Sequence, residues 1–182
     1  MEKLFTISIF TENQVGVLAR VAAVFTRRHL NIESITVSES EVEGVSRFTI
    51  LSKMNVDQVK KVVKQLEKQV EVLKAVYHRD EETVYQEIAL YKVPIHSIHN
   101  GMPVEEVIRK NQARILSMEK DFIILEKAGY KSEIKQLFDQ LKPFGLLEFV
   151  CSGRVAVTKP MKPFAEYLKE MELAQVAVGS LQ

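Results

Sequence analysis

The sequence predicts an α+β protein made of two β-α-β-β-α-β units. In both halves of the chain, apolar residues switch from alternating to helical spacing and back in the same order. A charged break, "HRDEET" at 78–83, separates the halves, and 182 residues suffice for two small domains. This order is the ferredoxin-like arrangement, in which two helices cover one face of an antiparallel sheet and leave the other face open.

The first unit opens with a strand and a helix. Residues 3–10, "KLFTISIF", have the β-branched and aromatic content of a well-buried strand. Residues 15–29 change to helical spacing. The apolar face of this helix is predicted to hold four residues: Leu18, Val21, Ala22 and Phe25.

A hairpin, a helix and a strand complete the first unit. Residues 32–53 alternate in two runs around "EVEG", where Gly44 is expected to adopt a positive φ. Asn55 is the expected N-cap of a helix over 55–69. Residues 70–78 alternate again and predict the fourth strand.

The second half repeats the order. Its expected elements are a strand at 84–94, a helix at 103–112, two strands around a turn near 119–121, a helix at 131–145 and a last strand at 146–159. A short helix over 163–174 is expected in the tail. The predicted divisions are a first domain at 1–78, a linker at 79–83, a second domain at 84–160 and a tail at 161–182.

Composition narrows the function classes. Lys plus Arg number 25 and Asp plus Glu 24, a balance that argues against a nucleic-acid binder acting through bulk charge. The one cysteine, Cys151, excludes an internal disulfide. No apolar run approaches the roughly 20 residues of a membrane span, and "MEKLFTISIF" lacks the features of a signal peptide. A cytoplasmic location is therefore expected.

Polar residues at the two ends of the first helix form the main candidate site. The N-terminal end of a helix has unpaired N–H groups and a positive dipole, so it can hold a carboxylate. Gly16 would let a ligand approach the backbone there, and Asn13 and Asn31 offer amide donors and acceptors. A ligand with a carboxylate, an ammonium group and a small apolar side chain would match this set, which describes an amino acid.

Structural roles for the same residues stay open at this point. Asn13 could be a helix cap, Gly16 could relieve packing, and Asn31 could end the helix in a left-handed conformation. The helix would also separate the asparagines by about 20 Å or more. One small ligand could touch both only if two subunits met about a two-fold axis and each contributed one end.

The stretch "ENQVGVLARVAAVFTRRHLNIESITV" at 12–37 closely resembles the start of the small regulatory subunits of acetolactate synthase, also called acetohydroxyacid synthase. "SRFTI" at 46–50, "KQLEKQVEV" at 64–72, "EIALYKV" at 87–93 and "SGRVAV" at 152–157 extend the resemblance over roughly 1–160. It implies that the first unit is an ACT domain, an amino-acid-sensing module.

The resemblance also implies function. It implies that Asn13, Gly16 and Asn31 bind valine across a homodimer interface, with Val17, Leu18 and Ile32 as further candidates. It implies a larger catalytic partner that holds thiamine diphosphate, Mg²⁺ and FAD. This chain would activate that partner and confer feedback inhibition by valine in branched-chain amino acid biosynthesis. No cofactor or metal is expected in this chain.

Other candidates have simpler explanations. His96 and His99 lack the further ligands of a metal site, so a solvated loop is favoured. Arg20, Arg27, Arg28 and His29 are best explained as an exposed helix face rather than a partner contact. Cys151 is expected to be a buried structural thiol.

No catalytic constellation is found in the sequence, so the chain is not expected to be a free-standing enzyme. The alternative function is an ACT-domain transcriptional regulator that responds to a ligand. The near-neutral charge and the lack of a helix-turn-helix segment count against it.

Overall fold

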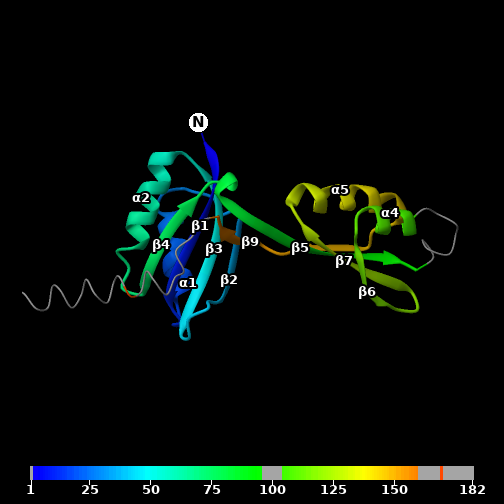
Figure 1. Ribbon diagram of the computed structural model, residues 1–182, viewed down its shortest axis with the longest axis horizontal. Coiled ribbons are helices and arrows are strands. Elements are labelled where there is room, and N and C mark those ends of the chain that lie inside the picture. Colours follow the sequence, from blue (N-terminus) through cyan, green and yellow to red (C-terminus); the bar gives the residue numbers. More distant parts are fainter. Residues whose placement is uncertain (1, 96–103, 160–168, 170–182) are drawn as a thin grey trace, which may run out of the picture.

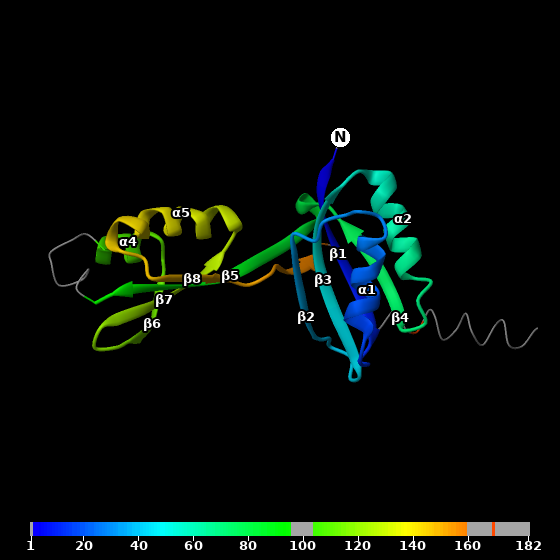
Figure 2. The same ribbon diagram turned by 180° about the vertical axis from the view of Figure 1, so that it is seen from behind.

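The computed structural model describes residues 2–95, 104–159 and 169. Figure 1 shows two layered bodies side by side along the long axis, each an antiparallel sheet with helices on one face. The long strand β5 (Thr83–Pro94) runs from the first body into the second, as the view from behind in Figure 2 also shows. In the described part of the chain, no helix is long and apolar enough to cross a bilayer.

The first body has the predicted β-α-β-β-α-β order. Its sheet has the strand order β2-β3-β1-β4, so β2 is an edge strand. Helices α1 and α2 pack on one face (Figure 2). The elements are β1 (Lys3–Glu12), α1 (Val17–Thr26), β2 (Ser34–Glu39), β3 (Val45–Met54), α2 (Val56–Leu66) and β4 (Val72–His78).

Alternation along β1 explains the two faces of this sheet. Phe5, Ile7 and Ile9 are fully buried in the core beneath the helices. Thr6 and Ser8 lie between them and point to the other face, yet both are also buried. The face of the sheet away from the helices is therefore polar, and another part of the chain covers it.

Local predictions for the first body are largely confirmed. Gly44 has φ +75°. Asn55 caps α2, because its side chain accepts the N–H of Gln58 at 2.9 Å and the Gln58 side chain accepts the N–H of Asn55 at 2.9 Å. This reciprocal pair satisfies two N–H groups at the helix start.

The predicted apolar face of α1 is wrong in part. The buried residues are Val17, Val21, Val24 and Phe25, whereas Leu18 is 52% exposed. The helix begins only at Val17, directly after Gly16. The face toward the sheet therefore follows the spacing i, i+4, i+7 and i+8 from Val17 rather than starting at Leu18.

The second body repeats the layer arrangement and confirms the α+β class with two ferredoxin-like units. Its sheet order is β6-β7-β5-β8, and α4 and α5 lie on one face (Figure 1). A 3₁₀ turn, η1 (Asp80–Glu82), leads into β5, and a second, η2 (Lys142–Phe144), extends α5. The other elements are α4 (Val104–Lys110), β6 (Arg114–Met118), β7 (Phe122–Gly129), α5 (Lys131–Leu141), β8 (Glu148–Cys151) and β9 (Val155–Thr158).

The single last strand predicted at 146–159 is wrong, because the structure divides it into β8 and β9. Both pair with β5, but β8 pairs with its second part and β9 with its first. Residues 152–154 separate the two strands. The break returns the chain from the second body to the first.

The second core forms between β5, β7 and the helices. Tyr91 is fully buried there, and its hydroxyl donates to the backbone oxygen of Ile134 at 2.8 Å. The opposite face of this sheet carries Ile88, Leu90 and Val150, which are between 37% and 55% exposed. No described element covers that face. His96, His99 and the tail from 160 onward, except residue 169, lie outside the described residues.

Candidate functional site

The turn between β1 and α1 places Gly16 at the start of the helix. The backbone N–H of Asn13 donates to the oxygen of Gly44 at 2.9 Å, which anchors the turn to the hairpin. Gly16 is the N-cap residue and has φ +87°, a left-handed conformation that side chains with a Cβ rarely adopt. Glycine adopts this conformation at no steric cost, because it has no Cβ.

The N-terminal end of α1 carries no side-chain cap. No side chain accepts a hydrogen bond at the N-cap position, and the first turn has no acidic residue. The first-turn N–H groups are therefore left for water or a ligand, at the positive end of the helix dipole. The alternative that Asn13 caps this helix is wrong. Its side chain is exposed and makes no hydrogen bond to any described residue.

Asn31 lies beyond the other end of α1 and does not end the helix. His29 takes the left-handed conformation there, with φ +53°. The exposed Asn31 side chain donates to Glu33 Oε1 at 3.1 Å, and its backbone oxygen accepts from Ser52 Oγ at 2.6 Å. The alternative helix-terminating role for Asn31 is therefore also wrong.

The two asparagines lie toward opposite ends of the strands of the first sheet. Glu12, just before Asn13, pairs with Val45 on β3, and Ser34, just after the Asn31 turn, pairs with Leu51. These β3 positions are six residues apart, or about 20 Å along a strand. One chain thus does not bring Asn13 and Asn31 together.

The three further candidates differ in what they expose. Val17 is buried in the core, so only its backbone is open to a ligand. Leu18 is half exposed on the outer side of α1. Ile32 is half buried and packs against the core.

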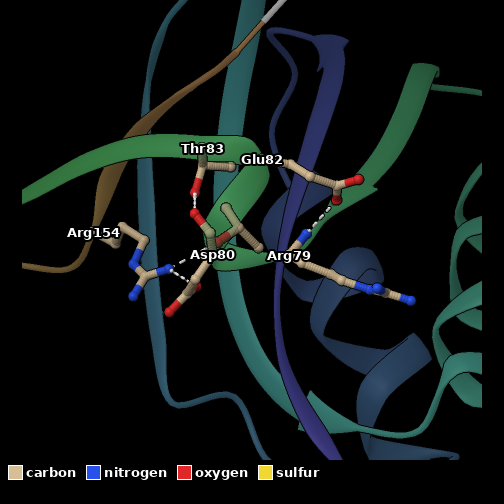
Figure 3. A network of polar contacts seen from close by, with 6 residues as sticks. Arg79, Asp80, Glu82, Thr83 and Arg154 are labelled. Carbon is tan, nitrogen blue, oxygen red and sulfur yellow. Dashed lines mark hydrogen bonds and ion pairs between the residues drawn. The ribbon is translucent and has the colours of Figure 1, made fainter.

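The contact between the two bodies involves residues that sequence reasoning missed. Arg154 is 2% exposed, and its Nη1 donates to Asp80 Oδ1 at 2.7 Å (Figure 3). The same Nη1 donates to Thr6 Oγ1 at 3.0 Å. Its guanidinium lies 3.4 Å from the centre of the Tyr85 ring. The available signal was a basic residue beside a glycine within an otherwise apolar strand pattern, "SGRVAV".

Cys151 is exposed, so the expectation of a buried thiol is wrong. It lies on the edge strand β8, and its Sγ is 3.7 Å from Glu87 Oε2. Partial burial, with a smaller effect of the Glu87 carboxylate, raises the pKa of the Cys151 thiol. A raised pKa disfavours the nucleophilic thiolate.

Two residues of the basic cluster, Arg20 and Arg28, contact other side chains of the first body, whereas Arg27 and His29 are exposed. Arg20 forms a 2.9 Å ion pair with Glu71, and Arg28 Nε donates to Gln65 Oε1 at 2.8 Å. Among the residues described, no group of three or more His, Cys, Asp and Glu side chains is placed to hold a metal ion.

Comparison with known proteins covers both bodies. Residues 7–74 match the family described as AHAS small subunit-like ACT domain, and residues 86–160 match the small subunit of acetolactate synthase. The first body is thus similar in sequence to an ACT domain, and it has the βαββαβ order of elements.

Similar curated proteins come from bacteria and archaea. The acetolactate synthase small subunit of Bacillus subtilis is 33% identical over 160 residues, covering 87% of this chain and 91% of that protein. The probable acetolactate synthase small subunit of Archaeoglobus fulgidus is 35% identical over 157 residues, covering 86% and 98%. The crystal structure of the Thermotoga maritima small subunit superposes with a TM-score of 0.79 at 29% identity, covering 88% of this chain and 99% of that one. This chain belongs to the acetolactate synthase small subunit family.

Proposed function

We propose that this chain activates the catalytic subunit of acetolactate synthase and confers feedback inhibition by valine, in the cytoplasmic synthesis of branched-chain amino acids. The partner would hold thiamine diphosphate, Mg²⁺ and FAD. Membership of the small-subunit family supports a regulatory role beside a catalytic subunit. The observation that carries the valine site is the uncapped start of α1, with Gly16 in a left-handed conformation and Asn13 exposed beside it.

The site is proposed to form between two copies of the chain. Asn13 and Asn31 lie toward opposite ends of the strands of one sheet, so a small ligand needs a second subunit to contact both. The edge strand β2 and the exposed apolar residues Val15 and Leu18 flank these ends. In such a dimer, the helix start would hold the valine carboxylate and the amides would meet its polar groups.

A ligand-responsive transcriptional regulator is less well supported. In the described residues no two α-helices follow each other in the chain, as a helix-turn-helix requires. Formal net charge is +1, which gives no electrostatic footprint for nucleic acid.

The test combines co-purification, activity and binding. The chain is expected to co-purify with a candidate catalytic subunit, to stimulate it, and to make it sensitive to valine. Alone, with the three cofactors present, it should form no acetolactate from pyruvate. Turnover by the pure chain, or no effect on the catalytic subunit, would contradict the proposal.

Substitution of the asparagines tests the site itself. Asn13→Ala and Asn31→Ala should each weaken valine inhibition roughly tenfold or more, because an unpaired polar group in a buried site costs about 1–3 kcal/mol. Neither caps α1, so melting temperature without ligand should change little. The matched control is Asn55→Ala, which removes a true cap. It should lower stability by about 1 kcal/mol and leave valine inhibition unchanged.

A mixed dimer tests sharing of the site. One Asn13→Ala subunit paired with one Asn31→Ala subunit should leave one intact site and one site with both lesions. Half of the sites would then bind valine normally. If each subunit carried a whole site, none would.

A further inference from the structure

A short segment from the second body covers the polar face of the first sheet. Gly153 lies so close to β2 that an added Cβ would be 2.6 Å from Thr36 Oγ1 and 2.9 Å from the Ile35 oxygen. The Thr36 hydroxyl donates to the Arg154 oxygen at 3.0 Å, and Arg47 Nη2 donates to the Ala156 oxygen at 2.7 Å. We name residues 153–156 the cover segment. With the Arg154 side chain on Thr6, it contacts β1, β2 and β3.

The cover segment is held by hydrogen bonds between specific pairs of atoms. Hydrogen bonds weaken steeply when distance or angle departs from the optimum, so a small shift of the segment would break several at once. The Arg154 charge is buried and relies on Asp80, whose side chain is 42% exposed. Separating the two groups would leave the buried guanidinium without its counter-charge, so arrangements that part them are penalised. The cover segment is thus held in one position rather than merely adhering to the sheet.

Arg154 also joins the two places where the chain passes between the bodies. One passage is at 152–154, where Arg154 itself lies, and the other is at 79–83. Asp80 belongs to the second passage, where Thr83 Oγ1 donates to the Asp80 oxygen at 3.2 Å (Figure 3). The bond from Arg154 to Asp80 therefore ties the two passages together, and its bond to Thr6 ties them to the first sheet.

The strands under the cover segment are those that carry the candidate ligand residues. Thr6 lies in β1, which ends one residue before Asn13. Thr36 lies in β2, five residues after Asn31. A change at either end of the proposed valine site therefore acts on a strand that holds the cover segment directly. From that segment, β8 and β9 pair with β5 and lead into the second sheet.

We propose that Arg154 is a positioning residue that couples the effector site to the second domain. The inference rests on the proposed function, since it assumes that valine binds near Asn13 and Asn31. Valine would favour one placement of β1 and β2, and the Arg154 contacts would convert that preference into a placement of the second domain. Coupling of this kind is reciprocal, so the catalytic partner must change the affinity for valine by the same factor.

The experiment measures that factor. The dissociation constant for valine is determined by calorimetry for the full chain, alone and saturated with the catalytic subunit, and their ratio is the coupling factor. Typical allosteric factors are about 5- to 150-fold. In Arg154→Gln the factor should fall toward one, while valine affinity of the chain alone stays within about threefold of wild type, because Arg154 contacts no ligand residue. Inhibition at saturating valine should become incomplete.

The matched control is Arg79→Gln, which removes the same charge from the other passage. Among the described residues, the Arg79 side chain forms an ion pair with Glu81 alone, at 3.8 Å on the surface, and its contact with Glu82 uses the backbone N–H. This variant should keep the wild-type factor. If Arg154→Gln does not fold, Asp80→Asn carries the test, because it removes the partner charge at nearly constant volume and should lower the factor in the same way.

Each outcome decides between the claims. A folded Arg154→Gln or Asp80→Asn variant that keeps the wild-type factor would overturn the role of Arg154 and leave the proposed function intact. If Arg79→Gln lowered the coupling factor equally, the effect would come from net charge alone, and the role of Arg154 would also be overturned. If wild-type chain binds no valine with or without the partner, the proposed function fails and this inference fails with it.

Discussion

The two sheets have the same strand order but treat their helix-free faces in opposite ways. On the first sheet that face carries Thr6, Ser8 and Thr49, and all three are buried. On the second sheet it carries Ile88 and Leu90, and both are exposed. Hydrophobic burial alone would predict the reverse. The cover on the first sheet therefore depends on directed polar contacts, and the second sheet keeps apolar surface of the kind that marks interaction sites.

This contrast predicts different behaviour for the separated domains. A fragment of residues 1–78 should fold alone, because removing the cover exposes serine and threonine side chains that water can satisfy. The main loss is three hydrogen bonds between the bodies, at about 0.5–1.5 kcal/mol each. A fragment of residues 84–159 should self-associate through its apolar face. Circular dichroism and sedimentation test both, and an unfolded 1–78 fragment would show that the cover is needed for the fold.

Filling the space between the cover segment and β2 should have the next largest effect, a loss of stability of the full chain. Gly153→Ala places a Cβ against backbone and hydroxyl atoms of β2, and overpacking of this kind costs about 1–3 kcal/mol. Val155→Leu, on the exposed side of the same segment, should change stability by less than about 0.5 kcal/mol. Urea unfolding of the full chain measures both. Equal stability of the two variants would mean that the cover segment moves freely.

A polar substitution on the uncovered face of the second sheet should weaken activation of the catalytic subunit more than it lowers stability. Leu90 is 37% exposed, so Leu90→Gln should change the unfolding free energy by about 0.5 kcal/mol or less. We expect it to reduce activation of the catalytic subunit severalfold, while Leu90→Met, which keeps the apolar surface, activates normally. Wild-type activation by Leu90→Gln would exclude this face as the partner surface.

Much of the fold follows from local sequence patterns, and the misses share a cause. Gly44 and Asn55 have short-range roles that depend on a turn and a helix start, and both were predicted correctly. The break between β8 and β9 and the burial of Arg154 depend on contacts with residues 64, 74 and 148 positions away. Spacing along the chain carries no information about such partners. For the same reason the sequence identified Asn13 and Asn31 as candidates but could not exclude helix capping, which needed the positions of Gly16 and His29.

The smallest predicted effect is a dependence of stability on pH that comes from the covered face of the first sheet. His78 lies on that face, opposite Thr6 in the sheet. Burial lowers the pKa of His78, the Glu82 carboxylate opposes this, and the Arg47 guanidinium lowers the pKa further. The folded state thus binds the proton less readily than the unfolded chain, whose histidine pKa is about 6.5. The contribution to stability is complete above that pH and is lost as pH falls through the lower folded value.

In urea unfolding, the full chain should lose stability between pH 7.5 and 5.5, and His78→Gln should lose less over the same interval. Comparing wild type with His78→Gln cancels the contribution of the carboxylates to the pH dependence, because these groups titrate in both proteins. If wild type and His78→Gln had the same dependence of unfolding free energy on pH, His78 would make no pH-dependent contribution to the stability of the covered face.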